Sequence, residues 1–154
     1  MLQTRDMAIR ESPKVLKFDF DLPPQELLLG HGIGVSGGAM GGRLVFSLEE
    51  IREWRLREPT TRLILARADT VPDDIREIHA ADGLLTERGG LTSHAAVVAH
   101  RLGKTCVVGC GSLVCNEREK RCVFPGAVLT SGEGISIDGR EGSVYRGIIK
   151  TEEA

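Results

Sequence analysis

The chain divides at Gly109 into two stretches with different hydrophobic patterns. Before Gly109, short apolar runs that predict buried strands alternate with segments of helical periodicity. These predicted strands are residues 43–46, 62–66, 83–86 and 106–108. After Gly109, Gly, Asn, Asp and Pro separate short strands only, expected at residues 113–115, 121–124, 127–130, 134–138 and 143–149. Alternating strands and helices followed by strands alone predict an α/β domain of mixed sheets with a helix layer on one side.

Helix start and stop signals predict three helices between the strands. Ser47 and Glu50 have the spacing of a capping box, ahead of an apolar face that predicts a helix of about three turns. Pro72 stands near the first position of a short helix whose first turn is acidic. The run HAAVVAHRL, residues 94–102, predicts a third helix that ends at Gly103, a natural C′ residue.

The first 28 residues are not expected to belong to the compact domain. Pro23-Pro24 can continue neither a helix nor a central strand, so residues 1–28 are expected to form an arm or connector. We expect the compact domain to span residues 29–150. It opens with a segment that holds seven glycines between residues 30 and 42 and leads into the first predicted strand.

Composition narrows the class of protein. The 154 residues suffice for one domain with a real core, and a formal net charge of -2 gives no basic field for nucleic acid or anionic membrane. No apolar run approaches the roughly 20 residues of a membrane span. The first 13 residues, MLQTRDMAIRESP, contain no apolar region of a secretory signal. A cytoplasmic protein is therefore expected.

The four cysteines, at positions 106, 110, 115 and 122, include no C-x-x-C pair. In a reducing compartment they are expected to be free thiols that pack as small hydrophobic side chains. Two alternatives are less favoured: a zinc site built from Cys110, Cys115, Cys122 and a histidine, and disulfide bonds.

His94 is the residue most suited to carry chemistry. It follows the turn Gly89-Gly90 and the two hydroxyl residues Thr92 and Ser93, which offer an N-cap, and it opens the third helix. A helix N-terminus presents unpaired N–H groups and partial positive charge, a ready site for an anion. A histidine there can act as a nucleophile whose phosphoryl group is held by those N–H groups and hydroxyls. The alternative is an ordinary histidine in a helix cap.

The motif around His94 resembles a known signature. GGLTSHAAVVAHRLGKTCVVGC, residues 89–110, is similar to the phosphohistidine domain of enzymes that use phosphoenolpyruvate, and its Gly-Lys-x-Cys-Val-x-Gly-Cys ending is most similar to pyruvate phosphate dikinase. Upstream TVPDDI and AADGLLT and downstream ISIDG and GSVY also match that family in order. The resemblance covers roughly residues 30–148. It implies a swivelling β/β/α phosphohistidine domain.

The resemblance also implies a function. His94 would accept the β-phosphoryl group of ATP through a pyrophosphoryl intermediate and hand a phosphoryl group to pyruvate. The domain would swivel between an ATP-grasp domain and a barrel domain that binds pyruvate or phosphoenolpyruvate, in the same or a separate chain. Those partner domains would hold Mg²⁺ and the substrates, a homodimer is possible, and the chain alone would be inactive.

Two further sets of residues acquire roles only through the resemblance. Thr92 matches a regulatory phosphorylation site of plant dikinases. Gln3 and Arg5 match positions at the end of the ATP-grasp domain that contact nucleotide, although without the rest of that domain they would bind nothing.

The sequence departs from the family at several places. The glycine-rich entry lacks the usual proline in Val35-Ser36-Gly37-Gly38, and His100 stands where arginine is usual. His100 is expected to be a surface residue, and His31 and His79 structural or exposed. Arg88 is either a contact for the phosphoryl group or a solvated loop charge.

Two other functions compete with the dikinase-like carrier. One is the same carrier in a phosphoenolpyruvate synthase or enzyme I setting. The other is a regulatory or docking module that binds a partner without transferring phosphate.

Overall fold

The computed structural model describes residues 15–21 and 24–153. The predicted nucleotide contacts Gln3 and Arg5 lie outside them. No helix within this part of the chain is both long and apolar enough to cross a membrane.

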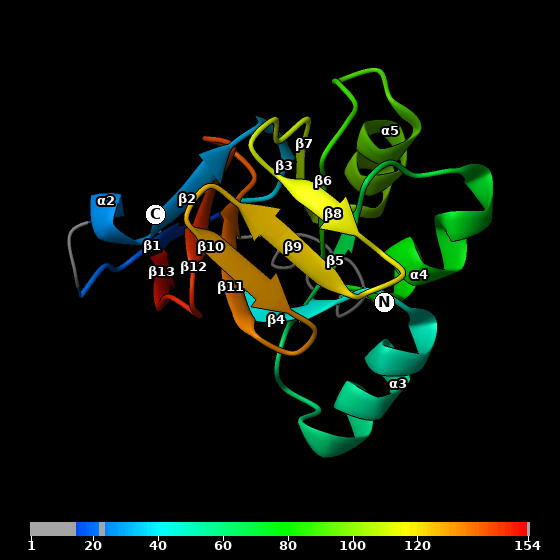
Figure 1. Cartoon of the computed structure of the whole chain (residues 1–154), viewed down its shortest axis with the longest axis horizontal. Helices are drawn as coiled ribbons and strands as arrows, with labels where there is room; N and C mark the ends of the chain where they lie inside the picture. Colours follow the sequence, from blue (N-terminus) through cyan, green and yellow to red (C-terminus); the bar gives the residue numbers. More distant parts are fainter. Residues whose placement is uncertain (1–14, 22–23, 154) are drawn as a thin grey trace, which may run out of the picture.

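A central sheet of eight strands organises the domain (Figure 1). The strands follow the order β2-β12-β11-β4-β5-β6-β7-β3, and β4 to β7 run parallel. Their bounds are β2 Leu28–His31, β3 Ile33–Ser36, β4 Ala39–Val45, β5 Leu63–Arg67, β6 Gly83–Thr86, β7 Thr105–Val108, β11 Gly134–Asp138 and β12 Ser143–Arg146. The remaining neighbours pair antiparallel. Consecutive strands β2 and β3 therefore occupy the two opposite edges of the sheet.

Helices pack on one face of this sheet. They are α3 Leu48–Arg57, α4 Ile75–Ala80 and α5 His94–Leu102; a 3₁₀ turn, η1 Pro72–Asp74, precedes α4, and a short α2 spans Pro24–Leu27. Alternate residues of the strands, such as Leu63, Leu65 and Leu84, join Ile51, Ile78 and the alanines of α5 in one buried cluster. Small alanines on the inner side of α5 allow the helix to approach the sheet closely.

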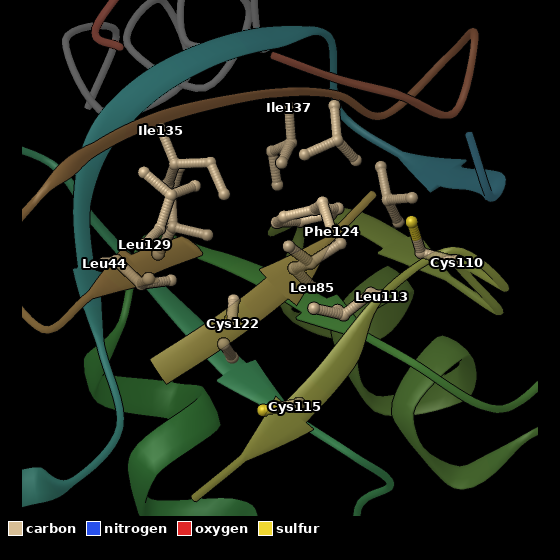
Figure 2. Packing of buried hydrophobic residues seen from close by; sticks show 14 of the residues in the cluster. Leu44, Leu85, Cys110, Leu113, Cys115, Cys122, Phe124, Leu129, Ile135 and Ile137 are labelled. Carbon is tan, nitrogen blue, oxygen red and sulfur yellow. The ribbon is translucent and has the colours of Figure 1, made fainter. Parts of the chain in front are cut away.

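A second, smaller sheet covers the other face. It consists of β8 Val114–Asn116, β9 Arg121–Phe124 and β10 Ala127–Thr130, paired antiparallel. Figure 2 shows Leu129, Phe124 and Cys122 of this sheet pointing toward Ile135 and Leu85 of the central sheet. The predicted layering of mixed sheets with helices on one side is confirmed as a β/β/α arrangement.

All four cysteines are buried free thiols, as expected. Burial raises the pKa of the Cys106 thiol to about 12 and also raises the pKa of Cys110. Cys115 and Cys122 lie opposite each other on β8 and β9, and this contact together with burial raises the pKa of Cys122. No group of three His, Cys, Asp or Glu side chains among the described residues could hold a metal ion.

The predicted helix ends are confirmed. The Glu50 N–H donates to Ser47 Oγ at 3.2 Å, so Ser47 is the N-cap of α3 as predicted. The Glu50 side chain accepts the Ser47 hydroxyl at 3.0 Å rather than the Ser47 backbone N–H, so the predicted capping box is formed only on the serine side. Gly103 ends α5 in the left-handed conformation, with φ of 67°.

Part of the predicted N-terminal arm packs against the domain. β1 Leu16–Phe18 pairs antiparallel with β13 Thr151–Glu153 near the other end of the chain. The rings of Phe18 and Phe20 contact Tyr145 edge-on, with centroids 5.4 and 5.1 Å away. The arm is thus partly folded onto β12, and the boundary at residue 28 stays a prediction.

Candidate functional site

His94 lies near the carboxyl ends of the parallel strands of the central sheet. β5 and β6 are neighbours, so the loop after β5 and the loop after β6 meet there. The first loop carries Thr70, and the second leads into α5 and His94. Functional groups commonly gather at the carboxyl ends of parallel strands, because the loops there converge.

The start of α5 is held by Ser93. Its Oγ accepts the N–H of Ala96 at 3.3 Å and donates to the Gly90 carbonyl at 2.7 Å. The Ser93 N–H donates to the same carbonyl at 3.0 Å. The predicted N-cap is therefore confirmed for Ser93, and both the donor and the acceptor of its hydroxyl are engaged in fixing the turn before His94.

The two glycines of the turn have different environments. Gly89 has φ of 107°, and a Cβ there would lie 3.0 Å from Ser93 Oγ, so both conformation and space require glycine. Gly90 has open space around the position of a Cβ. A side chain at position 90 would therefore meet no neighbour, whereas one at position 89 would be strained.

His94 is half-buried, and Thr70 is its ring partner. The Thr70 hydroxyl lies 3.1 Å from His94 Nδ1, and Thr70 itself is 7% exposed. A hydrogen bond on one ring nitrogen selects the tautomer and orients the ring. If Nδ1–H donates to the Thr70 hydroxyl, the lone pair of Nε2 is available as a nucleophile.

Arg67, at the end of β5, is buried and lies among three carboxylates beside the Thr70 loop. Its Nε lies 3.6 Å from Asp74 Oδ1 and 3.7 Å from Glu117 Oε1, and its Nη2 lies 3.9 Å from Glu77 Oε2. Nη1 donates to the Phe46 carbonyl at 2.5 Å. Nε is buried and has no hydrogen-bond partner among residues 15–21 and 24–153, where it lies between the carboxylates of Asp74 and Glu117.

Sequence reasoning missed the parts that Thr70 and Arg67 play. Thr70 was recognised in the sequence only as the first residue of the motif TVPDDI, and Arg67 follows directly after the predicted strand 62–66. The available signal was a charged residue and a hydroxyl residue at the end of an apolar strand whose parallel neighbour leads to His94.

The other candidates lie around this centre. Thr92 is exposed beside His94, and Arg88 is exposed and paired with Glu87 at 3.8 Å. Exposure of Arg88 is consistent with either of its two expected roles. His100 is exposed on α5.

Exposed apolar side chains stand on the segments that build the site. Val71 is 54% exposed next to Thr70, Leu91 is 63% exposed in the turn before His94, and Val97 is 42% exposed one turn further along α5. His94 is therefore flanked by apolar surface on both of its loops and on its helix.

Comparison with known proteins gives a consistent set of relatives. A family described as PEP-utilising enzyme, mobile domain, matches residues 59–142. Pyruvate, phosphate dikinase of Clostridium symbiosum is 43% identical over 127 residues, which cover 82% of this chain and 14% of that protein. Pyruvate, phosphate dikinase 2 of Zea mays is 43% identical over 123 residues, covering 80% of this chain and 14% of that protein.

The chain thus spans about one seventh of the length of these relatives. Among solved structures, an NMR structure of an Enzyme I (nEIt) protein is 27% identical, with a TM-score of 0.39, and the match covers 62% of this chain and 33% of that one.

Proposed function

The chain belongs to the PEP-utilising enzyme mobile-domain family, and from this premise we propose that it is the phosphoryl-carrier domain of a pyruvate phosphate dikinase-like phosphotransferase. In this proposal His94 is transiently phosphorylated and shuttles phosphate between an ATP site and a pyruvate or phosphoenolpyruvate site on partner domains. The contact between His94 Nδ1 and Thr70 Oγ1 at 3.1 Å is the observation that carries the proposal.

This contact leaves Nε2 as the reacting atom. In the proposed step the Nε2 lone pair forms the P–N bond as the P–O bond of phosphoenolpyruvate breaks, and pyruvate leaves as its enolate. The proton stays on Nδ1, shared with the Thr70 hydroxyl, so that the ring is held while its charge changes. Transfer in the other direction reverses each of these steps.

The start of α5 supplies the surroundings that a phosphoryl group needs. Its N–H groups and the positive end of its dipole favour the anion, and the exposed Thr92 hydroxyl is free to turn toward it. Ser93 contributes by holding the turn, because its hydroxyl already bonds Gly90 and Ala96. Gly89 and Gly90 complete the site by shaping that turn. Exposed Thr92 is also accessible to regulatory phosphorylation.

Mg²⁺, ATP and the pyruvate or phosphoenolpyruvate site belong, in this proposal, to the partner domains. The described residues offer no donor set for a metal ion. The relatives carry about six sevenths of their length outside this match, which is ample for a nucleotide-binding domain and a barrel domain. The exposed Val71, Leu91 and Val97 would exclude water around His94 when it enters a partner's active site.

Swivelling between the two partner sites requires that the domain move as a body. Antiparallel pairing of β1 with β13 brings the two ends of the described domain together, which suits attachment at a single place. A cytoplasmic location and assembly into a homodimer remain parts of the proposal.

The decisive experiment is phosphorylation in trans. The chain would be incubated with Mg²⁺, phosphoenolpyruvate and the barrel domain of a related dikinase, and analysed by mass spectrometry. We expect acid-labile, base-stable phosphate on wild-type protein and on the control His100→Ala, whose exposed imidazole lies on the same helix, but not on His94→Ala.

Phosphate on His94→Ala would contradict the assignment of the residue. A folded wild-type chain that stays unmodified beside a barrel domain active on its own carrier would favour the docking module. A second incubation with the homologous domain of a phosphoenolpyruvate synthase or of enzyme I distinguishes the other carrier settings by the faster reaction.

A further inference from the structure

Arg67 is tied to three separate segments at the edge of the sheet. Nη1 donates to the Phe46 carbonyl just after β4, while Nε and Nη2 face Asp74 and Glu77 around the start of α4 and Glu117 after β8. The Arg67 side chain is 8% exposed, so solvent screens its pairs with the mostly buried Asp74 and Glu77 only weakly and its pair with the exposed Glu117 more strongly. One buried cation thus holds together three carboxylates that would otherwise repel one another.

Two of these carboxylates also hold the backbone on both sides of Thr70. Glu117 Oε2 accepts the N–H of Ala68 at 3.0 Å, two residues before Thr70. Asp74 Oδ2 accepts the N–H of Val71 at 2.9 Å, directly after it. Each carboxylate turns one oxygen to Arg67 and the other to the backbone, so the position of the Thr70 loop depends on the Arg67 charge.

Thr70 transmits that position to His94. Its hydroxyl lies 3.1 Å from Nδ1, and a hydrogen bond of this length weakens steeply when either partner moves. Among the described residues, the Thr70 hydroxyl and His94 Nδ1 bond only each other, so loss of the Thr70 position would leave the ring free to exchange tautomers.

We propose that Arg67 is a positioning residue that fixes the tautomer of His94: through Asp74 and Glu117 it holds the Thr70 hydroxyl where it accepts the Nδ1 proton. The mechanistic value of this tautomer rests on the proposed carrier function, because it keeps the Nε2 lone pair free for the phosphoryl group. The coupling between Arg67 and the ring is a separate, directly measurable property.

The test reads the imidazole itself, without any phosphoryl donor. Nitrogen chemical shifts of isotope-labelled histidine distinguish Nδ1–H from Nε2–H, and the His94→Ala spectrum assigns the signals among the four histidines. At a pH where the imidazole is neutral, wild-type His94 is expected to carry its proton mainly on Nδ1. Arg67→Met should lower the Nδ1–H to Nε2–H ratio by about three- to tenfold, the effect of losing one hydrogen bond.

Two comparisons separate positioning from general destabilisation. Arg67→Lys keeps the charge without the planar fork and should restore part of the ratio. Arg43→Met is the matched control, because Arg43 is a part-buried arginine that pairs with Glu58 at 2.8 Å and donates to Gly132, and neither residue belongs to the Thr70 loop. Its tautomer ratio should equal that of the wild type.

Glu117→Ala keeps the test usable if Arg67→Met does not fold. Glu117 is 41% exposed, so we expect Glu117→Ala to fold, and the substitution removes one of the two carboxylates that hold the loop. We expect a shift in the same direction, smaller than that of Arg67→Met. Thr70→Val should give the largest shift, since it removes the acceptor.

An unchanged ratio in folded Arg67→Met or Glu117→Ala would overturn the proposal, as would an equal shift in Arg43→Met. A wild-type ring protonated mainly on Nε2 would overturn it as well. These outcomes do not depend on phosphorylation. A shifted ratio in a chain that no barrel domain phosphorylates would instead support the coupling and count against the carrier function.

Discussion

Cys106 has an environment that resists ionisation. The residue is fully buried on β7 beneath the helix layer, and desolvation raises the pKa of its thiol from 9.0 to about 12. Because the folded pKa lies above the unfolded one, the stabilising contribution is fully present below pH 9. It is lost as the pH rises toward 12, since only the unfolded chain then releases the proton.

The free energy of unfolding should therefore fall with pH in this range, by up to about 1.4 kcal/mol per pH unit from this one group. Urea denaturation at intervals between pH 9 and about 12 would measure the slope. We expect Cys106→Ala to have a smaller slope. Val107→Ala, which changes a buried neighbour on the same strand, should lower the stability and keep the wild-type slope. Equal slopes for wild type and Cys106→Ala would contradict the prediction.

The residues of the candidate site differ in how far sequence could predict them. His94, Ser93 and Gly103 owe their positions to neighbours within one helix, so local capping rules sufficed for them. Thr70 lies 24 residues before His94, and their contact exists only because β5 and β6 are adjacent and parallel. Arg67 depends in addition on Glu117, in the turn after β8, which no local pattern connects to it.

At the scale of elements, the caps of α3 and α5 form a natural pair for comparison. Ser47 and Ser93 each accept an N–H in the first turn of a helix, at 3.2 and 3.3 Å. Only Ser93 also holds the Gly90 carbonyl in the turn that leads to His94. The two serines should thus have similar effects on stability and different effects on the site.

We expect Ser93→Ala and Ser47→Ala each to lower the free energy of unfolding by about 1 kcal/mol in urea denaturation. Only Ser93→Ala should slow phosphorylation of His94, by roughly tenfold, because the turn and the first N–H groups lose their fixed orientation. A comparable slowing in Ser47→Ala would show that stability, rather than the turn, limits the reaction.

The elements between Gly42 and residue 146 were predicted well, whereas the strands before Gly42 and the last strand, β13, were not. Apolar runs and turn residues placed β5, β6, β7 and the β-rich final third within a residue or a few of their bounds. The glycine-rich segment 30–42 instead contributes to three strands, β2, β3 and β4. Glycine weakens strand propensity, but here close backbone contact requires it: a Cβ at Gly34 would lie 2.5 Å from the Gly139 carbonyl oxygen.

At the scale of the whole molecule, the two hydrophobic cores share the central sheet. Leu44 and Ile64 point into the core against the small sheet, while their neighbours Val45 and Leu65 point into the core against the helices. A substitution that destabilises one core therefore destabilises the other through the shared strands, and the domain should unfold as one unit.

Leu129→Ala tests this unity from the small sheet. Leu129 is 1% exposed, and its truncation should lower the free energy of unfolding by about 2–5 kcal/mol. Trp54, the single tryptophan, lies on α3 in the helix layer, so its fluorescence reports the other core. We expect the fluorescence and circular-dichroism transitions to shift together. Leu56→Ala, at an 86% exposed position, should change stability by no more than about 0.5 kcal/mol.

A fluorescence transition that stays in place while circular dichroism shifts would mean that the layers unfold separately.

The layering itself was predictable, because alternating strands and helices need helices on a sheet and the final strands need a second sheet. The strand order was not. β2 and β3 are separated only by Gly32, yet β2 pairs with β12 and β3 pairs with β7, and no local pattern connects either strand to its distant partner.

The β1–β13 pair gives the domain a defined response to mechanical load. Leu16 lies opposite Glu153 and Phe18 opposite Thr151, so tension applied at residues 16 and 153 acts on one end of the ribbon. The residue pairs of β1 and β13 would then separate one after another, each at a small force. The hydrogen bonds between the central strands would instead have to break together. A pulling force would therefore separate β1 from β13 first and leave the layered core, with His94 at its edge, undistorted.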